Sequence, residues 1–286
     1  MAMITLPHGA VHYRPHGPDD ATAPPVVFVH GILVGATLWS GVAEALAAQG
    51  VRSFAPDLPL GSHRVPVGAD ADQSPRGVAR QVIAFIEALD LHDVTLVGND
   101  TGGAICQYLL DTDASRIGRL VLTNCDAFEQ FPPPSLRRFI ELVTRPAALA
   151  GAAQAMRATR FRHGRFGFGP FANSFDADMT AAWVEPARTD ERVRDDLVRF
   201  ARAIDPDDLV AVGGRLNAFA GPVRLVWGTA DPYFTLDLAR RIQAAFTDAS
   251  LVEVDGARTF VALDAPDVVA EEIVSLTQEG RRRAAS

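Results

Sequence analysis

The sequence contains no lysine, because all 27 of its basic residues are arginines. Without a lysine amine, catalysis through a Schiff base is excluded, and with it the usual chemistry of pyridoxal phosphate. Cysteine is also scarce. The spacing of the two cysteines, Cys106 and Cys125, fits neither a disulfide framework nor a metal site. We therefore expect no bound metal and no cofactor.

Long apolar runs and an excess of positive charge are absent as well. No apolar segment approaches the roughly 20 residues that a membrane-spanning helix needs. The first residues show neither the basic nor the apolar region of a secretion signal. The net charge of −8 disfavours nucleic acid and anionic membranes as partners. These absences predict a cytoplasmic protein that binds a small molecule, and they leave its oligomeric state open.

The chain of 286 residues does contain an alternation of short β-branched runs with helical segments. The runs predict strands near residues 11–14, 26–29, 51–56, 94–98, 119–123, 223–227 and 251–254. Strands separated by helices imply a mostly parallel sheet with right-handed crossovers. The predicted class is therefore α/β, with helices on both faces of a central sheet.

The alternation stops between residues 128 and 219, where no short β-branched run occurs. Helical patterns lie in this segment near residues 136–142, 147–159 and 192–204. We predict that residues 128–219 form a helical cap. The cap would be inserted between two parts of one core, residues 1–127 and 220–286.

The most informative stretch joins a predicted strand to a predicted helix. It reads Val-Thr-Leu-Val-Gly-Asn-Asp-Thr-Gly-Gly over residues 94–103, with Asp100 between small neighbours that permit a strained turn. This is the pattern of a nucleophile elbow, in which serine is the usual reactive residue. The elbow aims the N–H of Thr101 and the positive end of a helix dipole at the reactive group. Asp100 is thus a candidate nucleophile that forms an ester with carbon.

Three further motifs follow predicted strands, in a fixed order around the elbow. His30-Gly31 precedes it, the predicted cap starts after Asp126, and Trp227-Gly228-Thr229-Ala230-Asp231 comes later. Four motifs, each at the end of a strand, resemble those of an α/β-hydrolase. The acid in the elbow makes the chain similar to the haloalkane dehalogenase and epoxide hydrolase branch. The resemblance implies an α/β-hydrolase fold and a site at the carboxyl ends of the strands.

The resemblance also implies roles for single residues. Asp100 corresponds to the nucleophile, and the N–H groups of Ile32 and Thr101 correspond to the oxyanion hole. Asp231 or Asp126 corresponds to the acid that orients a base. Like charges that meet at one site cannot all ionise, so one of these carboxyls would be protonated at neutral pH.

The family pattern fails at its catalytic histidine. The place of that residue lies in Asp-Gly-Ala-Arg-Thr-Phe-Val over residues 255–261, where the aligned residue is Thr259. Without a histidine, an ester on Asp100 lacks the base that activates water, a contribution of about 10²–10⁴-fold. The resemblance gives His30 and Gly31 a supporting role in bracing the oxyanion loop.

Substrate features of the known branches are missing too. The positions that hold halide in haloalkane dehalogenases are Thr101 and Ile32 here. Epoxide hydrolases protonate the epoxide through tyrosines of the cap, and Tyr13, Tyr108 and Tyr233 all lie outside the predicted cap.

Three functions stay open on this sequence. The first is a hydrolase that attacks a small or medium apolar substrate through Asp100, with an unusual or missing base. The second is a lyase, isomerase or cyclase in which Asp100 moves protons. The third is a catalytically silent protein that only binds its ligand. Trp39 and Trp183 are candidate pocket residues, with ordinary core packing as the alternative.

Overall fold

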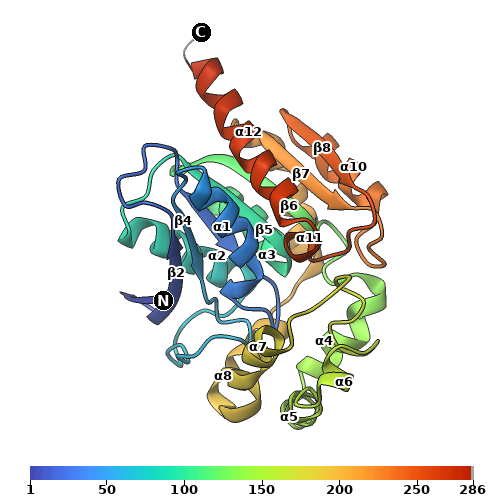
Figure 1. Ribbon diagram of the computed structural model, residues 1–286. Coiled ribbons are helices and arrows are strands. Elements are labelled where there is room, and N and C mark those ends of the chain that lie inside the picture. Colours follow the sequence, from blue (N-terminus) through green and yellow to red (C-terminus); the bar gives the residue numbers. More distant parts are fainter. Residues whose placement is uncertain (285–286) are drawn as a thin grey trace.

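The computed structural model describes residues 1–284 and contains a sheet of eight strands (Figure 1). The strands are β1 (Ala2–Leu6), β2 (Gly9–His16), β3 (Val26–Val29), β4 (Ser53–Pro56), β5 (Val94–Asp100), β6 (Ile117–Cys125), β7 (Val223–Gly228) and β8 (Ala249–Val254). Their order is β1-β2-β4-β3-β5-β6-β7-β8. Strand β2 is antiparallel to β1 and β4, and all other pairs are parallel. The predicted α/β class with a mostly parallel sheet is confirmed.

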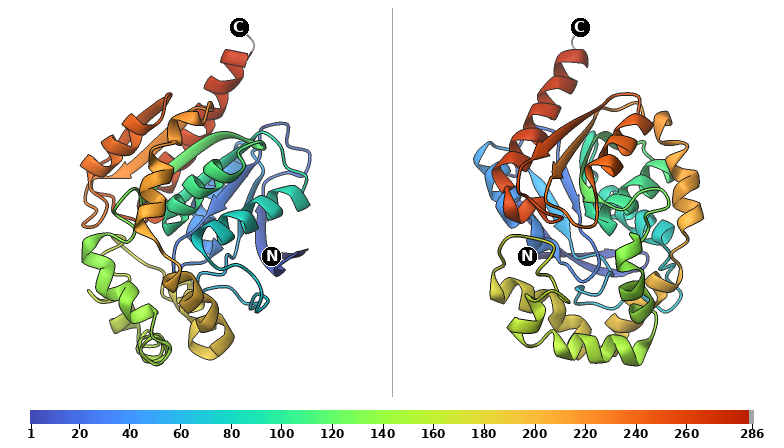
Figure 2. Two further views of the ribbon diagram at one scale, coloured as in Figure 1. Left: turned by 180° about the vertical axis from the view of Figure 1, so that it is seen from behind. Right: turned by 90° about the vertical axis from the view of Figure 1, so that its right-hand side faces the viewer.

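Helices cover both faces of this sheet. The helices α1 (Ser40–Ala48) and α12 (Pro266–Ala284) lie side by side on one face, while α2 (Pro75–Ala88) and α3 (Thr101–Thr112) cover the other (Figures 1 and 2). Helix α10 (Leu236–Ala245) packs against β7 and β8. Because β3 is covered on both faces, all four of its residues are buried and apolar.

Strand β5 lies in the middle of the sheet, between β3 and β6. Its last residue is Asp100, and α3 begins at Thr101. Apolar layers on both faces therefore fix the point at which this strand turns into its helix. The side chain of Asp100 consequently emerges at the centre of the carboxyl edge of the sheet.

Between β6 and β7 the described chain forms helices and no strand of the sheet. They are η2 (Pro134–Leu136), α4 (Arg137–Val143), α5 (Pro146–Ala155), α6 (Thr159–Arg162), α7 (Ala177–Thr189), α8 (Glu191–Arg202), α9 (Pro206–Gly213) and η3 (Leu216–Ala218). Helices α4 to α8 lie below the sheet in Figure 1, beyond the carboxyl ends of its strands. Helices α9 and η3 instead pack against α3. The short helices η1 (Ala36–Trp39) and α11 (Val261–Asp264) complete the fold.

The sequence pattern missed several elements, and for strand β1 and helix α7 the reasons are physical. Strand β1 is a short edge strand in which partly buried and exposed residues alternate, so its sequence, Ala-Met-Ile-Thr-Leu, lacks the β-branched run that marks a strand buried on both faces. Helix α7 contains Pro186 in its interior, which disfavours a helix, although the Asp176 carboxylate caps its start by accepting a hydrogen bond from Met179 N–H at 2.6 Å. Helices α9 and α10 were also not predicted. None of the helices in the described chain has the length and apolar content that a membrane crossing requires.

A buried polar pair ties the core to helix α8. The ring of His63, in the loop after β4, donates from Nε2 to Asp196 Oδ2 at 3.0 Å, because its Nδ1 already accepts from Gly61 N–H at 3.3 Å. Asp196 also accepts from Val67 N–H at 3.0 Å and from Arg199 at 2.6 Å. Burial raises the pKa of Asp196, but these hydrogen bonds outweigh burial and leave that pKa below its ordinary value. The carboxylate therefore stays ionised inside the protein.

Candidate active site

The backbone at Asp100 makes the sharp strand-to-helix turn that the sequence predicts. Its φ is 56° and its ψ is −132°, a conformation that costs energy for any residue with a side chain. The turn also needs a close approach of neighbouring backbone. At Gly102 a Cβ atom would overlap the carbonyl oxygen of Val29, so only glycine fits. The local sequence thus supplies both the strain and the space that raise Asp100 above the sheet.

The loop after β3 comes against Asp100 from the other side. A Cβ atom on Gly31 would overlap Asp100 Oδ2, so the carboxyl group lies directly on the backbone of this loop. The next residue, Ile32, lines the same cavity as Asp100. Leu33 has a φ of 57°, and its N–H donates to Leu60 O at 2.8 Å. These contacts hold the loop that the sequence assigns to the oxyanion hole beside the elbow.

His30 is buried beneath this loop, and both of its ring nitrogens are engaged. Its Nδ1–H donates to Gly31 O at 2.9 Å, while Nε2 accepts from Leu58 N–H at 2.8 Å. Burial lowers the pKa of His30 and favours the neutral ring. A neutral ring with both nitrogens occupied has no free position for a proton from a substrate. These contacts connect the ring to Gly31 and Leu58, and the bracing role that the resemblance implies for His30 stays a prediction.

The Asp100 carboxyl group is held near the middle of its titration at neutral pH. It is 8% exposed. Burial and the charge of Asp231 raise the pKa of Asp100 to about 7, against the opposing effect of the Thr101 backbone amide. A carboxyl group with this pKa can both accept and donate a proton near pH 7.

Asp126 adjoins Asp100 at the start of the segment after β6. Its N–H donates to Asp100 O at 3.4 Å, and its Oδ2 accepts from the Thr101 hydroxyl at 3.2 Å. Its Oδ1 is buried without a hydrogen-bond partner among the described residues. Burial and the charge of Asp100 raise the pKa of Asp126 well above its ordinary value. Both effects favour the protonated form of the Asp126 carboxyl next to the elbow.

Asp231 lies behind the cavity wall and is fixed by several donors. Its Oδ1 accepts from the N–H groups of Tyr233 and Phe234 at 2.7 and 3.2 Å, and its Oδ2 accepts from Asn124 at 2.7 Å. Burial raises the pKa of Asp231 against the effect of these hydrogen bonds. Asp231 does not line the cavity, but its charge acts on Asp100.

Thr259, the residue that the sequence pattern aligns with the family's histidine, lies beside Asp231. The residue is fully buried, and its hydroxyl helps to lower the pKa of Asp231 although Oγ1 makes no hydrogen bond of standard geometry within the described chain. Its carbonyl oxygen accepts from Asn99 at 2.7 Å, which ties this loop to the residue before Asp100. A threonine hydroxyl cannot replace imidazole as a base near neutral pH.

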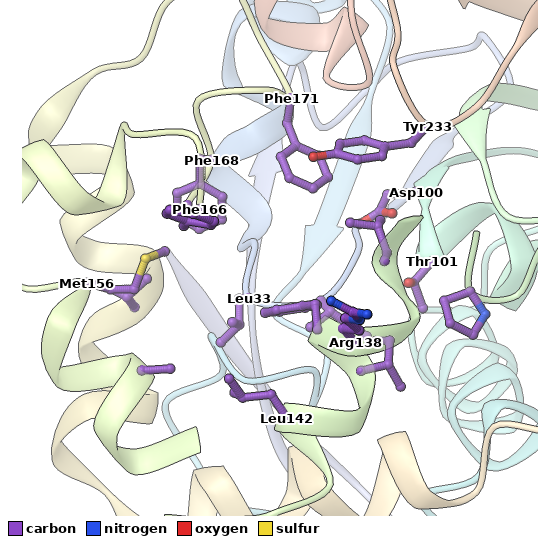
Figure 3. A pocket seen from close by; sticks show the side chains of 18 of the residues that line it. Leu33, Asp100, Thr101, Arg138, Leu142, Met156, Phe166, Phe168, Phe171 and Tyr233 are labelled. Carbon is purple, nitrogen blue, oxygen red and sulfur yellow. The ribbon is translucent and has the colours of Figure 1, made fainter. Parts of the chain in front are cut away.

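A cavity of about 500 Å³ opens above Asp100, within the range of small-molecule sites (Figure 3). Asp100, Thr101 and Asp126 contribute its polar floor. Most of its wall is apolar and includes Ile32, Leu33, Leu142, Leu149, Met156 and Phe168. None of the described residues that line it is a histidine. The structure thus brings two of the three predicted carboxyls into one apolar chamber.

Several residues that line the cavity were not predicted from the sequence. Tyr233 lines the cavity, and its ring lies near Asp100 and Phe171 in Figure 3. Burial and the charges of Asp231 and Asp100 raise the pKa of Tyr233, so its hydroxyl keeps its proton. Its place in the loop after β7, two residues after Asp231, was the available signal. Phe166 and Phe168 lie in an aromatic stretch that is equally typical of packing.

The two tryptophans proposed for the pocket lie elsewhere. Trp39 is fully buried and stacks on Phe28 with ring centroids 4.8 Å apart. Trp183 donates from Nε1 to the Thr37 hydroxyl at 2.6 Å and contacts Phe168 edge-on from behind the wall. Neither ring lines the cavity. This corrects the expectation for both residues and leaves packing as their role.

Residues that could hold a metal are not grouped in the described chain. Across residues 1–284, no three side chains of histidine, cysteine, aspartate or glutamate come together as a metal site. The carboxyl groups near Asp100 are held by hydrogen bonds from the protein, as described for Asp126 and Asp231.

A protein-family model described as the alpha/beta hydrolase fold matches residues 24–266 of the chain. Among solved structures, an ancestral haloalkane dehalogenase superposes with a TM-score of 0.79 at 20% identity, covering 99% of this chain and all of the other. The epoxide hydrolase CorEH superposes with a TM-score of 0.78 at 20% identity, covering 97% and 98%. At such identities these superpositions show the fold alone.

Relatives of known name are moderately similar in sequence. A 2-hydroxy-6-oxononadienedioate/2-hydroxy-6-oxononatrienedioate hydrolase of Paraburkholderia xenovorans is 26% identical, over 84% of this chain and 81% of its own length. Haloalkane dehalogenase 2 of Mycobacterium bovis is 27% identical, over 93% and 91%. The resemblance seen in the sequence motifs is confirmed at the level of the superfamily.

Proposed function

Since the chain belongs to the α/β-hydrolase fold family, we propose that it is an enzyme of that fold in which Asp100 transfers protons to and from an apolar organic substrate. The observation that carries this proposal is the state of Asp100. Its carboxyl has a pKa raised to about 7, and it lies on the floor of an apolar cavity that no described histidine lines. We propose further that residues 128–219 act as the cap of this cavity, since α4 and α5 contribute to its wall.

The absence of a histidine base argues against hydrolysis of an ester on Asp100. Such an ester is cleaved only when a base activates water, and Thr259 occupies the position of that base. His30 offers no substitute, because its ring nitrogens are engaged with Gly31 and Leu58. A covalent adduct would therefore persist and stop the enzyme. Proton transfer needs no such step.

A proton-transfer cycle uses the groups that the cavity provides. The ionised Asp100 takes a proton from a carbon next to a carbonyl group, and the electron pair of the C–H bond moves toward the carbonyl oxygen. The Tyr233 hydroxyl, which keeps its proton, donates a hydrogen bond to that oxygen. Asp100 then returns the proton to the substrate at the same or another carbon. No water is consumed, and the charge on the enzyme is restored.

The environment of Asp100 suits a base that works at neutral pH. A carboxylate of ordinary pKa, about 3.9, is a weak base toward carbon acids. Raising the pKa of Asp100 to about 7 makes the ionised form a stronger base while keeping it populated at pH 7. Asp126 assists by holding its own proton and by accepting from Thr101, the residue whose amide contacts Asp100. Charge repulsion at the floor is thereby reduced.

Exchange of carbon-bound hydrogen tests this function without knowledge of the natural substrate. The aromatic ketone 2-tetralone is apolar, fits a cavity of about 500 Å³, and has acidic protons beside its carbonyl. In D₂O the protein is expected to accelerate loss of the α-proton signals in the proton NMR spectrum. The rate should rise with pH up to about 7 and then level off, because the base is the ionised form of Asp100.

A second candidate, attack of Asp100 on carbon, has its own support. Asp100 Oδ2 lies against Gly31, and the Thr101 amide acts on the same carboxyl, as an oxyanion hole would require. Incubation with 1-chlorohexane and styrene oxide distinguishes the two candidates. A stable mass increase located on Asp100, with no exchange of 2-tetralone, would favour the nucleophile. Binding without either reaction across ketone, halide and epoxide probes would favour a silent binding protein.

A further inference from the structure

Two arginines line the cavity without a carboxylate partner. Arg138, on α4, makes no ion pair or hydrogen bond with any described residue. Arg165 only stacks on Phe166, with its guanidinium carbon 4.4 Å from the ring centroid. Both side chains belong to exposed residues, so they lie at the mouth of the cavity and not at its floor. In Figure 3 the Arg138 guanidinium lies between Leu33 and Thr101.

The charge of this region is opposite to that of the whole protein. Residues 134–175 carry seven arginines and one glutamate, whereas the chain has a net charge of −8. Arg137 and Glu141 share helix α4 with Arg138. A local excess of positive charge on an acidic protein attracts small anions to this side of the molecule.

The mouth is also aromatic. Phe139, Phe161 and Phe166 line the cavity while remaining 38%, 38% and 71% exposed. Further inside, the wall is formed by buried apolar residues such as Leu149 and Phe168. The chamber therefore offers apolar contact along its depth and positive charge at its rim.

We propose that the cavity binds an amphipathic organic acid, whose apolar body fills the chamber and whose carboxylate pairs with Arg138 at the mouth. A guanidinium group presents two parallel N–H donors that match the two oxygens of a carboxylate. The negative charge of ionised Asp100 repels an anion from the floor. The carboxylate is thus held at the rim, and the uncharged end of the ligand is directed toward Asp100. The binding mode itself does not depend on the proposed function. Only the statement that the uncharged end of the ligand meets a reacting group, Asp100, rests on it.

Binding of a matched pair of probes tests the inference without any turnover. We use 4-phenylbutyrate and its neutral isostere 4-phenylbutyramide, and measure their Kd values by titration calorimetry at low ionic strength. The wild-type protein is expected to bind the acid about tenfold more tightly than the amide, because only the acid forms a charge-assisted pair with Arg138 at this partly exposed site. The Arg138→Gln variant is expected to bind both probes equally. Added salt should weaken binding of the acid alone.

Arg137→Gln provides the control, because Arg137 is an exposed arginine on the same helix that does not line the cavity. It is expected to retain the preference for the acid. Equal affinities of wild type for acid and amide would overturn the inference, as would identical losses in the Arg138 and Arg137 variants. Loss of exchange activity in an Asp100 variant that still prefers the acid would leave this inference standing, so its failure and that of the proposed function are separable.

Discussion

Replacing Asp100 by asparagine is expected to lower the protein-dependent exchange of 2-tetralone by about 10²–10⁴-fold. Asparagine keeps the size of the side chain and the elbow but has no basic oxygen. The cavity, the Tyr233 hydroxyl and the neighbouring acid Asp126 all remain in this variant. The loss therefore measures the base itself, by proton NMR of the ketone in D₂O.

The matched control is Asp113→Asn, which removes an exposed carboxylate just beyond α3. Its exchange rate should equal that of the wild type.

The free energy of unfolding of Asp100→Asn offers a second check, because the direction of its change can be predicted. Because the pKa of Asp100 is raised to about 7, its ionisation destabilises the folded state as pH rises from about 4 to 7. Asp100→Asn should therefore be the more stable protein above pH 7. Full exchange activity in this variant would contradict the assignment of the base.

Replacing Asp196 by alanine is expected to lower the free energy of unfolding by about 3–5 kcal/mol. The substitution leaves the buried His63 ring and the Val67 N–H without their acceptor, and Arg199 without its ion pair. It also cuts the link between helix α8 and the loop after β4. The effect is large because His63 and Asp196 are each nearly inaccessible to solvent. Urea denaturation followed by circular dichroism measures the loss.

Asp195 supplies the comparison for this variant, since it precedes Asp196 on α8 and is exposed. Asp195→Ala should change the free energy of unfolding by no more than about 0.5 kcal/mol. The contribution of Asp196 should be present at neutral pH and disappear in acid, as pH falls through its lowered pKa. Equal effects of the two substitutions would show that the buried pair does not stabilise the protein.

Much of the fold was predictable because the central strands are buried on both faces. The apolar run at 26–29 predicts a buried strand, and the glycine-rich turn at Asp100 predicts a sharp change from strand to helix. Strand β1 was not predictable from the same signal, since it lies at an edge of the sheet. Helix α7 was not predicted, because Pro186 lies in its interior. The sequence thus identifies strands that are buried on both faces, and it misses elements such as α7, whose formation depends on one favourable contact.

The site was predictable only where residues follow strands. Asp100 and Asp126 meet because β5 and β6 are neighbours whose carboxyl ends share one edge. The positions of Tyr233 and Arg138 depend on how loops and α4 fold back over that edge, which no local pattern specifies. The two tryptophans illustrate the converse. Size and aromatic character suggested a pocket role for Trp39, but its ring fills the core against Phe28.

The titration of Asp100 tests the central claim most directly. Carbon NMR of protein labelled at the aspartate carboxyls, with the Asp100 signal assigned by its loss in Asp100→Asn, gives the midpoint. The expected midpoint for the wild type is about 7, and it should fall in Asp231→Asn because a neighbouring negative charge is removed. A wild-type midpoint near the ordinary aspartate value of about 3.9 would contradict the account of Asp100 as a proton-transfer group.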